Sequence, residues 1–430
     1  MKTYEAIEQY LAHYAESEIR EVAQLRLTQS DHVLVIPAFQ ETTQDLLRVI
    51  AGIDDHFLLI VVCNSGVHDT LTVRLHEELT AADDNVSVGN LSWIQSRNML
   101  VVDRCTPTRY IPHKQGVGLA RKIGSDIALA LIHQRTVSQP VIHLTDADAR
   151  LPHNYFRCLE TTTIAAAWIY PFDHISHTVS NNDHERDAMA LYEASVHYYA
   201  AGLRWAGSPY AYTTVGSAMA ISPRHYAAVR GFPKRNAGED FHILNKLRKT
   251  GAICSIPSPP AVPIGVSARL STRVPIGTGT AVRQITSMSN PLQEFSFYDP
   301  QVFIELNRLI TMATSRLMQP APYDAPWIPS SSADILNTVV EQLNLGAALS
   351  RCSRQSSNPE RRVRAFHDWF DGLKTLRLIH GLRDAGLKSL PFSELMQLPP
   401  FLNLSTGSSP ADFSQKMRAY LHAAPVHEAT

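Results

Sequence analysis

The chain alternates short apolar runs with longer segments of helical spacing, a pattern typical of α/β proteins. His32–Ile36, Leu58–Cys63 and Val141–Leu144 are mostly apolar and rich in β-branched residues, as expected of strands buried on both faces. Further strands are predicted at Ile164–Phe172 and Thr214–Ile221. Strands separated by helix-length segments form βαβ units, so we expect a largely parallel sheet.

Helices are predicted between these strands. Leu46–Gly52 follows a start signal at Thr42–Asp45, and a second helix begins near Asp69. After a less regular stretch, a third helix begins at Gly116-Val117-Gly118 and has apolar residues every four positions, at Leu119, Ile123, Ile127 and Leu131. A fourth helix is predicted at Phe241–Thr250.

Outside this region only helical periodicity is present. Lys2–Leu27 predicts an amphipathic helix, and Val302–Leu317, Ala333–Leu343 and Arg361–Arg383 predict helices separated by Pro- and Ser-rich connections. We therefore expect three parts: an N-terminal helix packed on the main domain at 1–30, an α/β domain at 31–284, and a helical C-terminal region at 285–430.

The composition limits the possible partners and location. A chain of 430 residues exceeds one ordinary core, and 44% hydrophobic with 18% charged residues is typical of globular proteins. The net charge of -1 predicts no nucleic-acid partner. The five cysteines are dispersed, Met1–Leu11 lacks the apolar core of a signal peptide, and no apolar run approaches about 18 residues. We expect a cytoplasmic protein without a transmembrane segment.

Two aspartates directly follow the strand at Val141–Leu144. Open α/β sheets bind ligands outside the carboxyl ends of their strands, where Asp146 and Asp148 are expected to lie. Two carboxylates in one turn repel each other unless a cation lies between them, and Mg²⁺ is held by one or two carboxylates together with substrate phosphates. The alternative is that both aspartates are solvated turn formers.

Three short motifs occur in a fixed order along the chain: Pro37-Ala38-Phe39-Gln40-Glu41 after the first strand, Asp146-Ala147-Asp148, and Gly238-Glu239-Asp240. This order resembles that of the inverting family 2 glycosyltransferases of the GT-A fold. Their first strand ends in Pro-x-Tyr/Phe-Asn-Glu, from which Gln40 departs, and their Gly-x-Ala-Arg-Asn element is matched loosely at 118–122. The resemblance covers about residues 31–280. It implies a GT-A-type, Rossmann-like mixed sheet flanked by helices.

The resemblance also implies a chemistry of the hexosyltransferase type. A sugar would move from a nucleoside-diphosphate sugar to a hydroxyl, with Mg²⁺ or Mn²⁺ held by Asp148, and with Asp146 directed to the ribose or the metal. Asp240 would be the general base, and Glu239 would orient the acceptor. The donor would further contact residues at the first strand end and at the third helix start: Pro37, Ala38, Phe39, Glu41, Gly118 and Arg121.

The two acids at 239–240 and the glycine pair at 116–118 each have a second interpretation. Acidic residues in the first turn of a helix interact with its dipole, worth about 0.3–1 kcal/mol each, which alone could explain Glu239 and Asp240. The dipole would lower the pKa of Asp240, whereas nearby phosphates would raise it. Gly116-Val117-Gly118 could let backbone amides approach an anion, or could be a plain turn pair.

Five further residues are candidates. Asn64 stands where family members commonly carry an aspartate that contacts the nucleotide base, and it leaves the nucleotide open. Gly216 and Ser217 would let a ligand, such as the acceptor, or another backbone come close. Arg273 is a candidate clamp for the leaving diphosphate, or a surface ion pair. His174 follows a strand end and is an acceptor contact or a structural residue.

Other functions are weighed against the transferase. A nucleotidyltransferase should carry a glycine-rich loop after its first strand, and Pro37–Glu41 has none. An Asp-x-Asp-x-Thr phosphatase would have threonine at Arg150. A non-catalytic sugar- or nucleotide-binding protein on the same fold stays open. No Gln-x-x-Arg-Trp string follows Asp240, which predicts a non-processive enzyme. The C-terminal helices could form a membrane-surface contact, a lid or a homodimer interface.

Overall fold

The protein is described by a computed structural model. Its described residues are 2–67, 69–159, 164–174, 183–259, 261–267, 278–319, 334–398 and 409–423. The chain divides into two compact units, of which the first comprises 1–180, 214–281 and 422–430, and the second 181–213 and 282–421. The second unit thus includes a segment, 181–213, that lies inside the α/β domain as the sequence predicts it.

The described residues of the first unit form a nine-stranded sheet in the order β10-β7-β9-β6-β1-β2-β5-β4-β3. Its strands are β1 (His32–Ala38), β2 (Phe57–Asn64), β3 (Asn85–Val88), β4 (Leu91–Ile94), β5 (Met99–Arg104), β6 (Ile142–Leu144), β7 (Ala167–Ile169), β9 (Met219–Ile221) and β10 (Ile253–Ser255). The central strands β6, β1, β2 and β5 are parallel, whereas β9 and β4 pair antiparallel to their neighbours.

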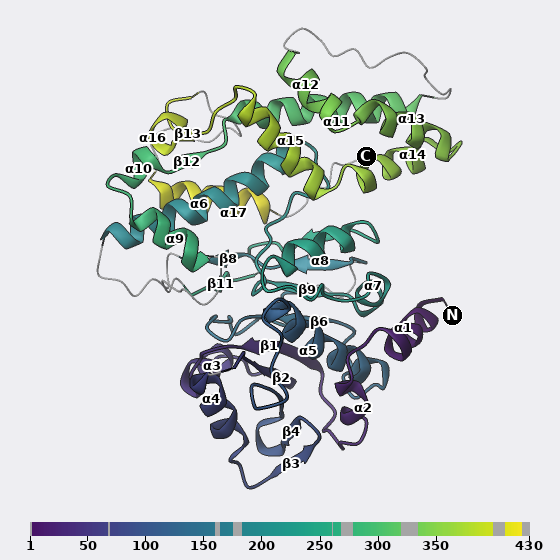
Figure 1. The fold of residues 1–430 in the computed structure, drawn as a ribbon, viewed down its shortest axis with the longest axis vertical. Coiled ribbons are helices and arrows are strands. Elements are labelled where there is room, and N and C mark those ends of the chain that lie inside the picture. The colour runs from purple at the N-terminus through teal and green to yellow at the C-terminus, as the bar shows by residue number, and fades with distance from the viewer. Residues whose placement is uncertain are drawn as a thin grey trace. The chain divides into compact units, whose positions relative to one another are not determined.

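Helices cover both faces of this sheet. They include α3 (Thr43–Ile50) and α4 (Thr70–Thr80) on one side and α5 (Gly116–His133) on the other, as right-handed crossovers require (Figure 1). The predicted start signals are confirmed, because Thr42 and Asp69 accept hydrogen bonds from the first-turn amides of α3 and α4. The predicted fold class, a Rossmann-like mixed sheet flanked by helices plus a helical C-terminal region, is confirmed.

The first strand continues past the proline that was expected to end it. Pro37 pairs with Val62 of β2, and β1 extends to Ala38. Residues of one parity along a strand direct their backbone groups to the same neighbour, and Val35 accepts a hydrogen bond from Thr145 on the β6 side. The backbone of Pro37 therefore also faces β6, which has already ended at this level. The missing N–H of the proline costs no hydrogen bond in the sheet.

Other predicted elements are divided or shorter than expected. Ile164–Phe172 holds two strands, β7 and β8 (Phe172–Asp173), and β8 pairs with β11 (Ile264–Gly265) in a separate small sheet. Within Thr214–Ile221 only β9 is a strand. The N-terminal segment folds as α1 (Lys2–His13) and α2 (Glu18–Val22).

Helix α1 is fastened to α5 by a buried polar cluster. The Tyr10 hydroxyl donates to Asp126 Oδ1 at 2.6 Å, and Lys122 Nζ lies 2.8 Å from Asp126 Oδ2. Tyr226, on α7 (Pro223–Ala228), donates to the same carboxylate at 2.7 Å. Each buried group in this cluster has partners, so the cluster orients the back face of α5.

The described residues of the second unit are mainly helical. They form α6 (Asp183–Trp205), α11 (Pro300–Met318), α12 (Asp334–Gln342), α13 (Leu345–Gln355), α14 (Pro359–Trp369), α15 (Gly372–Asp384) and α17 (Pro410–Leu421), with shorter elements between them. The helix predicted at Arg361–Arg383 is broken because Asp371 caps a new helix start. Where the chain is described, none of its helices is long and apolar enough to cross a membrane.

Candidate functional site

The carboxyl ends of β1, β2 and β6 meet at one edge of the sheet. Asp146 and Asp148 follow β6 in a turn closed by the Ala149 amide, which donates to the Asp146 carbonyl at 3.2 Å. The loop is held from two sides: the Thr145 amide donates to Val35 on β1 at 3.2 Å, and the Thr145 hydroxyl donates to the Ser217 carbonyl at 3.0 Å. Because β9 is antiparallel to β6, Ser217 reaches this same edge.

Arg121 lies at the centre of this edge. Its Nη2 is 2.5 Å from Asp146 Oδ1 and its Nε is 3.0 Å from Glu239 Oε1, while only 3% of the arginine is exposed. Its Nη1 is buried and has no hydrogen-bond partner among the described residues. The N–H groups of this nitrogen are therefore hydrogen-bond donors without an acceptor in the described structure.

Gly216 makes room for this arginine. A Cβ atom built on Gly216 would lie 2.4 Å from Arg121 Nη2, closer than two such atoms approach. The space that a side chain at position 216 would need is thus occupied by the Arg121 guanidinium, whereas the predicted approach of a ligand or another backbone stays a prediction. Thr145 was not singled out from the sequence, although its place between a buried strand and the first aspartate was the available signal.

The glycines at the start of α5 hold the loop that precedes Asp240. The Gly118 amide donates to the Arg235 carbonyl at 2.9 Å, and a Cβ atom on Gly118 would lie 2.4 Å from the Pro233 carbonyl oxygen. A Cβ atom on Gly116 would similarly lie 2.7 Å from the Asn236 backbone. The Gly118 amide is thus engaged by a protein carbonyl, and the glycine pair permits two backbones to approach closely.

The loop leads into α8 (Glu239–Arg248), whose first turn carries both acids. Glu239 is buried against Arg121, whereas Asp240 is partly exposed and accepts a hydrogen bond from the Phe241 amide at 2.7 Å. Burial, followed by the neighbouring Glu239, raises the pKa of Asp240 to about 7, although the Phe241 amide and Arg121 oppose this shift. A carboxylate with a pKa near neutrality suits general-base catalysis.

The ends of β1 and β2 are joined through Asn64. Oriented by its hydrogen bonds, the Asn64 side-chain amide donates to the carbonyls of Ala38 and Val62 at 3.3 and 3.2 Å. Beyond Ala38, Gln40 has a positive φ of 55° and its amide donates to Thr72 Oγ1 at 2.8 Å. The motif at 37–41, with Phe39 and a buried Glu41, therefore bends sharply at this edge.

Of the two remaining predicted site residues, His174 is among the described residues and Arg273 is not. The His174 ring is fully buried, packs edge-on against Phe172 at 5.2 Å, and has its Nε2 3.4 Å from Thr278 Oγ1. These contacts fit the structural interpretation. The strand β8 before His174 pairs with β11, and β11 is linked to the chain after the aspartate loop, because Arg150 and Gly265 exchange backbone hydrogen bonds of 2.7 and 2.9 Å. Arg273 lies outside the described residues.

The carboxylates suit a metal that takes part of its coordination from a ligand. Nowhere in the described ranges do three or more His, Cys, Asp or Glu side chains gather in a way that could hold a metal ion alone. Asp146 and Asp148 supply two carboxylates, one of them already paired with Arg121. Mg²⁺ commonly binds one or two carboxylates plus substrate phosphates, so this donor set fits a metal that arrives with a phosphorylated substrate.

Comparison with solved structures gives likenesses of limited extent, among them two proteins bound to nucleotide sugars. No family model and no curated protein matches the sequence. S. aureus TarS, residues 1–349, in complex with UDP-GlcNAc, is 10% identical with a TM-score of 0.34, over 65% of this chain and 66% of that one, just under two thirds of its length. The mannosyltransferase PcManGT from Pyrobaculum calidifontis, in complex with GDP-Man and Mn²⁺, is 13% identical with a TM-score of 0.32, over 87% of this chain and 96% of that one. At this level the likeness assigns no family or activity to the chain.

Proposed function

We propose that the protein transfers a single sugar from a nucleoside-diphosphate sugar to a hydroxyl acceptor, with inversion at the anomeric carbon. The observation that carries this proposal is the double ion pair of Arg121, which joins Asp146 to Glu239, the neighbour of a base-competent Asp240. Two acidic elements from distant parts of the chain meet at the ligand-binding edge of an α/β sheet. One has the protonation behaviour of a base, and the other has the carboxylates of a metal-phosphate site.

Asp240 would act on the acceptor. As the acceptor oxygen attacks the anomeric carbon, its proton passes to an Asp240 carboxylate oxygen, and the bond between that carbon and the diphosphate oxygen breaks. The diphosphate leaves with the electron pair of that bond. A base with a pKa near 7 is about half ionised at neutral pH and retains affinity for the proton. Glu239, fixed by Arg121, would orient the acceptor hydroxyl.

The donor would lie along the edge formed by the ends of β1, β2 and β6. Asp148, with Asp146, would hold Mg²⁺ or Mn²⁺, which when bound neutralises charge on the leaving diphosphate. Arg121 would direct its unpaired Nη1 to the same group. The nucleotide would contact the 37–41 segment and Asn64, and the acceptor would approach past Gly216 and Ser217.

The proposal includes the remaining predicted site residues but does not depend on them. Arg273 stays a candidate clamp, Gly118 a candidate donor contact, and His174 a candidate acceptor contact whose buried packing favours a structural role. The cytoplasmic location and the homodimer are likewise proposals.

Calorimetric titration with UDP and GDP, each with and without Mn²⁺, tests the donor site. We expect one nucleotide to bind only with metal, and Asp148→Ala to abolish that binding. Asp83→Ala, which removes an exposed aspartate far along the chain from the aspartate loop, is the matched control and should bind normally. A folded protein that binds neither nucleotide would contradict the donor site and favour the non-catalytic alternative.

A further inference from the structure

A cavity lies at the opposite edge of the sheet from Asp146. It has a volume of about 600 Å³ and is lined by residues before β6 and β7, after β9, and at the end of α5. Val141 precedes β6 whereas Asp146 follows it, and Ser222 follows β9 whereas Ser217 precedes it. The cavity is therefore separated from the candidate catalytic edge by the length of these strands. Its volume is within the range typical of small-molecule sites, about 300–1,000 Å³.

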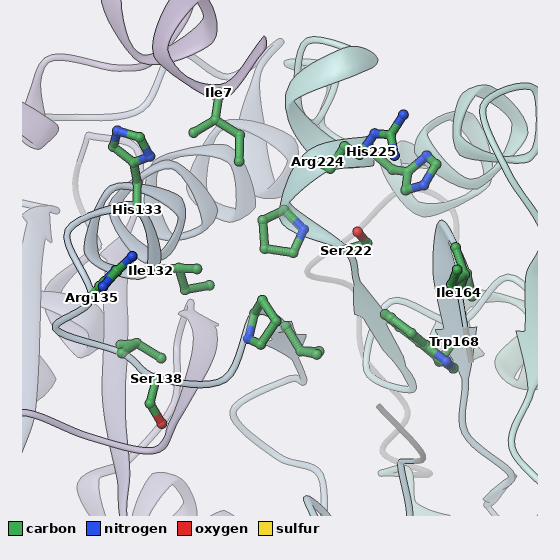
Figure 2. Close-up of a pocket in the computed structure, with 15 residues that line it drawn as sticks. Ile7, Ile132, His133, Arg135, Ser138, Ile164, Trp168, Ser222, Arg224 and His225 are labelled. Atoms are coloured by element: carbon green, nitrogen blue, oxygen red, sulfur yellow. The ribbon is translucent and has the colours of Figure 1, made fainter. Parts of the chain in front are cut away.

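The interior of the cavity is apolar. Figure 2 shows Ile132 from the end of α5 on one side and Trp168 of β7 with Ile164 on the other, while Ile7 of α1 lies above them. Ile164 is 90% exposed at this site, an unusual exposure for a large aliphatic side chain. A ligand that covers these side chains would gain from the removal of apolar surface from water.

The charged residues that line the cavity are all basic. Arg135 follows α5 and Arg224 lies in α7, and neither guanidinium has an ion-pair or hydrogen-bond partner within the described part of the chain. No carboxylate is among the lining residues in the part of the chain that the structure describes. Two exposed acids contact lining residues from outside: the Ser138 hydroxyl donates to Asp31 Oδ1 at 3.3 Å, and Glu8 Oε1 lies 3.9 Å from His133 Nε2. His225 Nδ1 lies within hydrogen-bond distance of Thr250 Oγ1, at 2.8 Å. Burial, followed by the nearby Arg224, lowers the pKa of His225.

Capping of α5 does not account for Arg135. The last carbonyls of the helix already accept backbone amides: Ala130 from Gln134, Ile132 from Arg135, and Leu131 from Thr136 and Val137. Arg135 itself adopts the left-handed region, with φ at 64°. Its side chain is thus placed at the cavity without a local electrostatic partner.

We propose that this cavity binds an amphiphilic anion, a molecule with an apolar body and one carboxylate or phosphate group. The apolar body would lie between Ile132 and Trp168, and the anionic group would pair with Arg135 or with Arg224, which Figure 2 shows on opposite sides of the cavity. Guanidinium groups favour carboxylate and phosphate because two parallel N–H groups match two oxygens. The proposal is independent of the sugar transfer, because it uses none of the residues at the Asp146 edge.

Decanoate tests the proposal, with decan-1-ol as the neutral analogue of the same length. Calorimetry on the full chain, below the micellar range, should give saturable binding of decanoate and weaker binding of decan-1-ol. The double substitution of Arg135→Gln and Arg224→Gln should lower the affinity for decanoate by about tenfold or more and leave the affinity for decan-1-ol unchanged. Arg97→Gln removes an exposed arginine elsewhere and should change neither affinity.

Two further variants locate the site. Ser138→Phe places a ring at the exposed, lining position 138 and should block binding, with circular dichroism confirming the fold. Trp168→Phe should remove the decanoate-induced change in tryptophan fluorescence. Decanoate binding that matches decan-1-ol, or that survives Ser138→Phe, would overturn the proposal. So would sedimentation that shows a dimer dissociated by Ser138→Phe, because a second copy would then occupy the cavity.

Discussion

Arg121 and Asp146 form an ion pair of 2.5 Å although 25 positions separate them in the chain. The pair joins the start of α5 to the loop after β6, and the same guanidinium reaches Glu239 at the start of α8. One side chain therefore fixes the relative positions of the two acidic motifs. Because it is almost fully buried, its loss would leave charged groups without compensation.

Arg121→Met should lower the free energy of unfolding by about 3 kcal/mol, since removal of one member of a buried pair leaves Glu239 uncompensated. Urea denaturation measures the change. Arg48→Met is the control, because Arg48 pairs with Asp45 at 3.3 Å on an exposed helix face and such pairs contribute about 0–1 kcal/mol. Equal effects of the two substitutions would contradict the central role of Arg121.

Asp240 should make stability fall as pH rises. Its pKa of about 7 in the folded state exceeds the value of about 3.9 in an unfolded chain, so the folded state binds the proton more tightly. The stability that this proton contributes is complete below about pH 4 and is lost as the pH rises through about 7.

Asp240→Asn should remove this pH dependence. Compared with the variant, the native chain should lose on the order of 2 kcal/mol between about pH 4 and pH 8, a figure reduced for the partial exposure of the carboxylate. Urea unfolding of both proteins across this range measures the difference. A constant difference at all pH values would show that the pKa of Asp240 is not raised.

The same carboxylate should govern activity. If Asp240 is the base, kcat/KM for sugar transfer should rise with pH through an apparent pKa near 7, and Asp240→Asn should lower kcat by about 10²–10⁴-fold. Nucleotide binding should survive the substitution, which separates loss of the base from loss of the donor site. A variant with native kcat would exclude Asp240 as the base.

The strands nearest the site were predictable from the sequence, because β1, β2 and β6 are continuous apolar runs that only a doubly covered sheet can bury. The hairpin of β3 and β4 was not predicted. Its strands are four residues long, and β3 is partly exposed, so neither gives a clear period.

The candidate site was predictable only in part. The acidic motifs were found at strand and helix ends, where local sequence marks them. The pairing of Arg121 with both motifs depends on three elements that are distant in sequence, and so does the raised pKa of Asp240. The helix dipole favoured a lowered pKa for Asp240, and burial beside Glu239 outweighs it.

The cluster that fastens α1 to α5 gives a separate prediction. Tyr10→Phe should lower the free energy of unfolding by about 1–3 kcal/mol, because Asp126 loses a buried hydrogen bond of 2.6 Å. Tyr14→Phe is the control close by in the chain, since Tyr14 is 38% exposed and should give almost no change. Similar losses from both substitutions would contradict a specific role for the Tyr10 hydroxyl.

Gly118→Ala should disturb the loop before Asp240. The new methyl group would lie 2.4 Å from the Pro233 carbonyl oxygen and 2.6 Å from that of Arg235, and both are backbone atoms that must shift as a unit. Overpacking of this kind costs about 1–3 kcal/mol. Gly52→Ala is the matched control, because nothing lies within 4 Å of the position that its new methyl group would take and its φ is not left-handed.

The two readouts of this substitution separate packing from positioning. Thermal unfolding should show the loss for Gly118→Ala and almost none for Gly52→Ala. If the loop positions the base, kcat should also fall while metal-dependent nucleotide binding changes little, because Thr145, at the start of the aspartate loop, is bonded to β1 and to Ser217 and not to the loop before Asp240. A loss of nucleotide binding equal to the loss of kcat would instead assign Gly118 to the donor site, as the family resemblance implies.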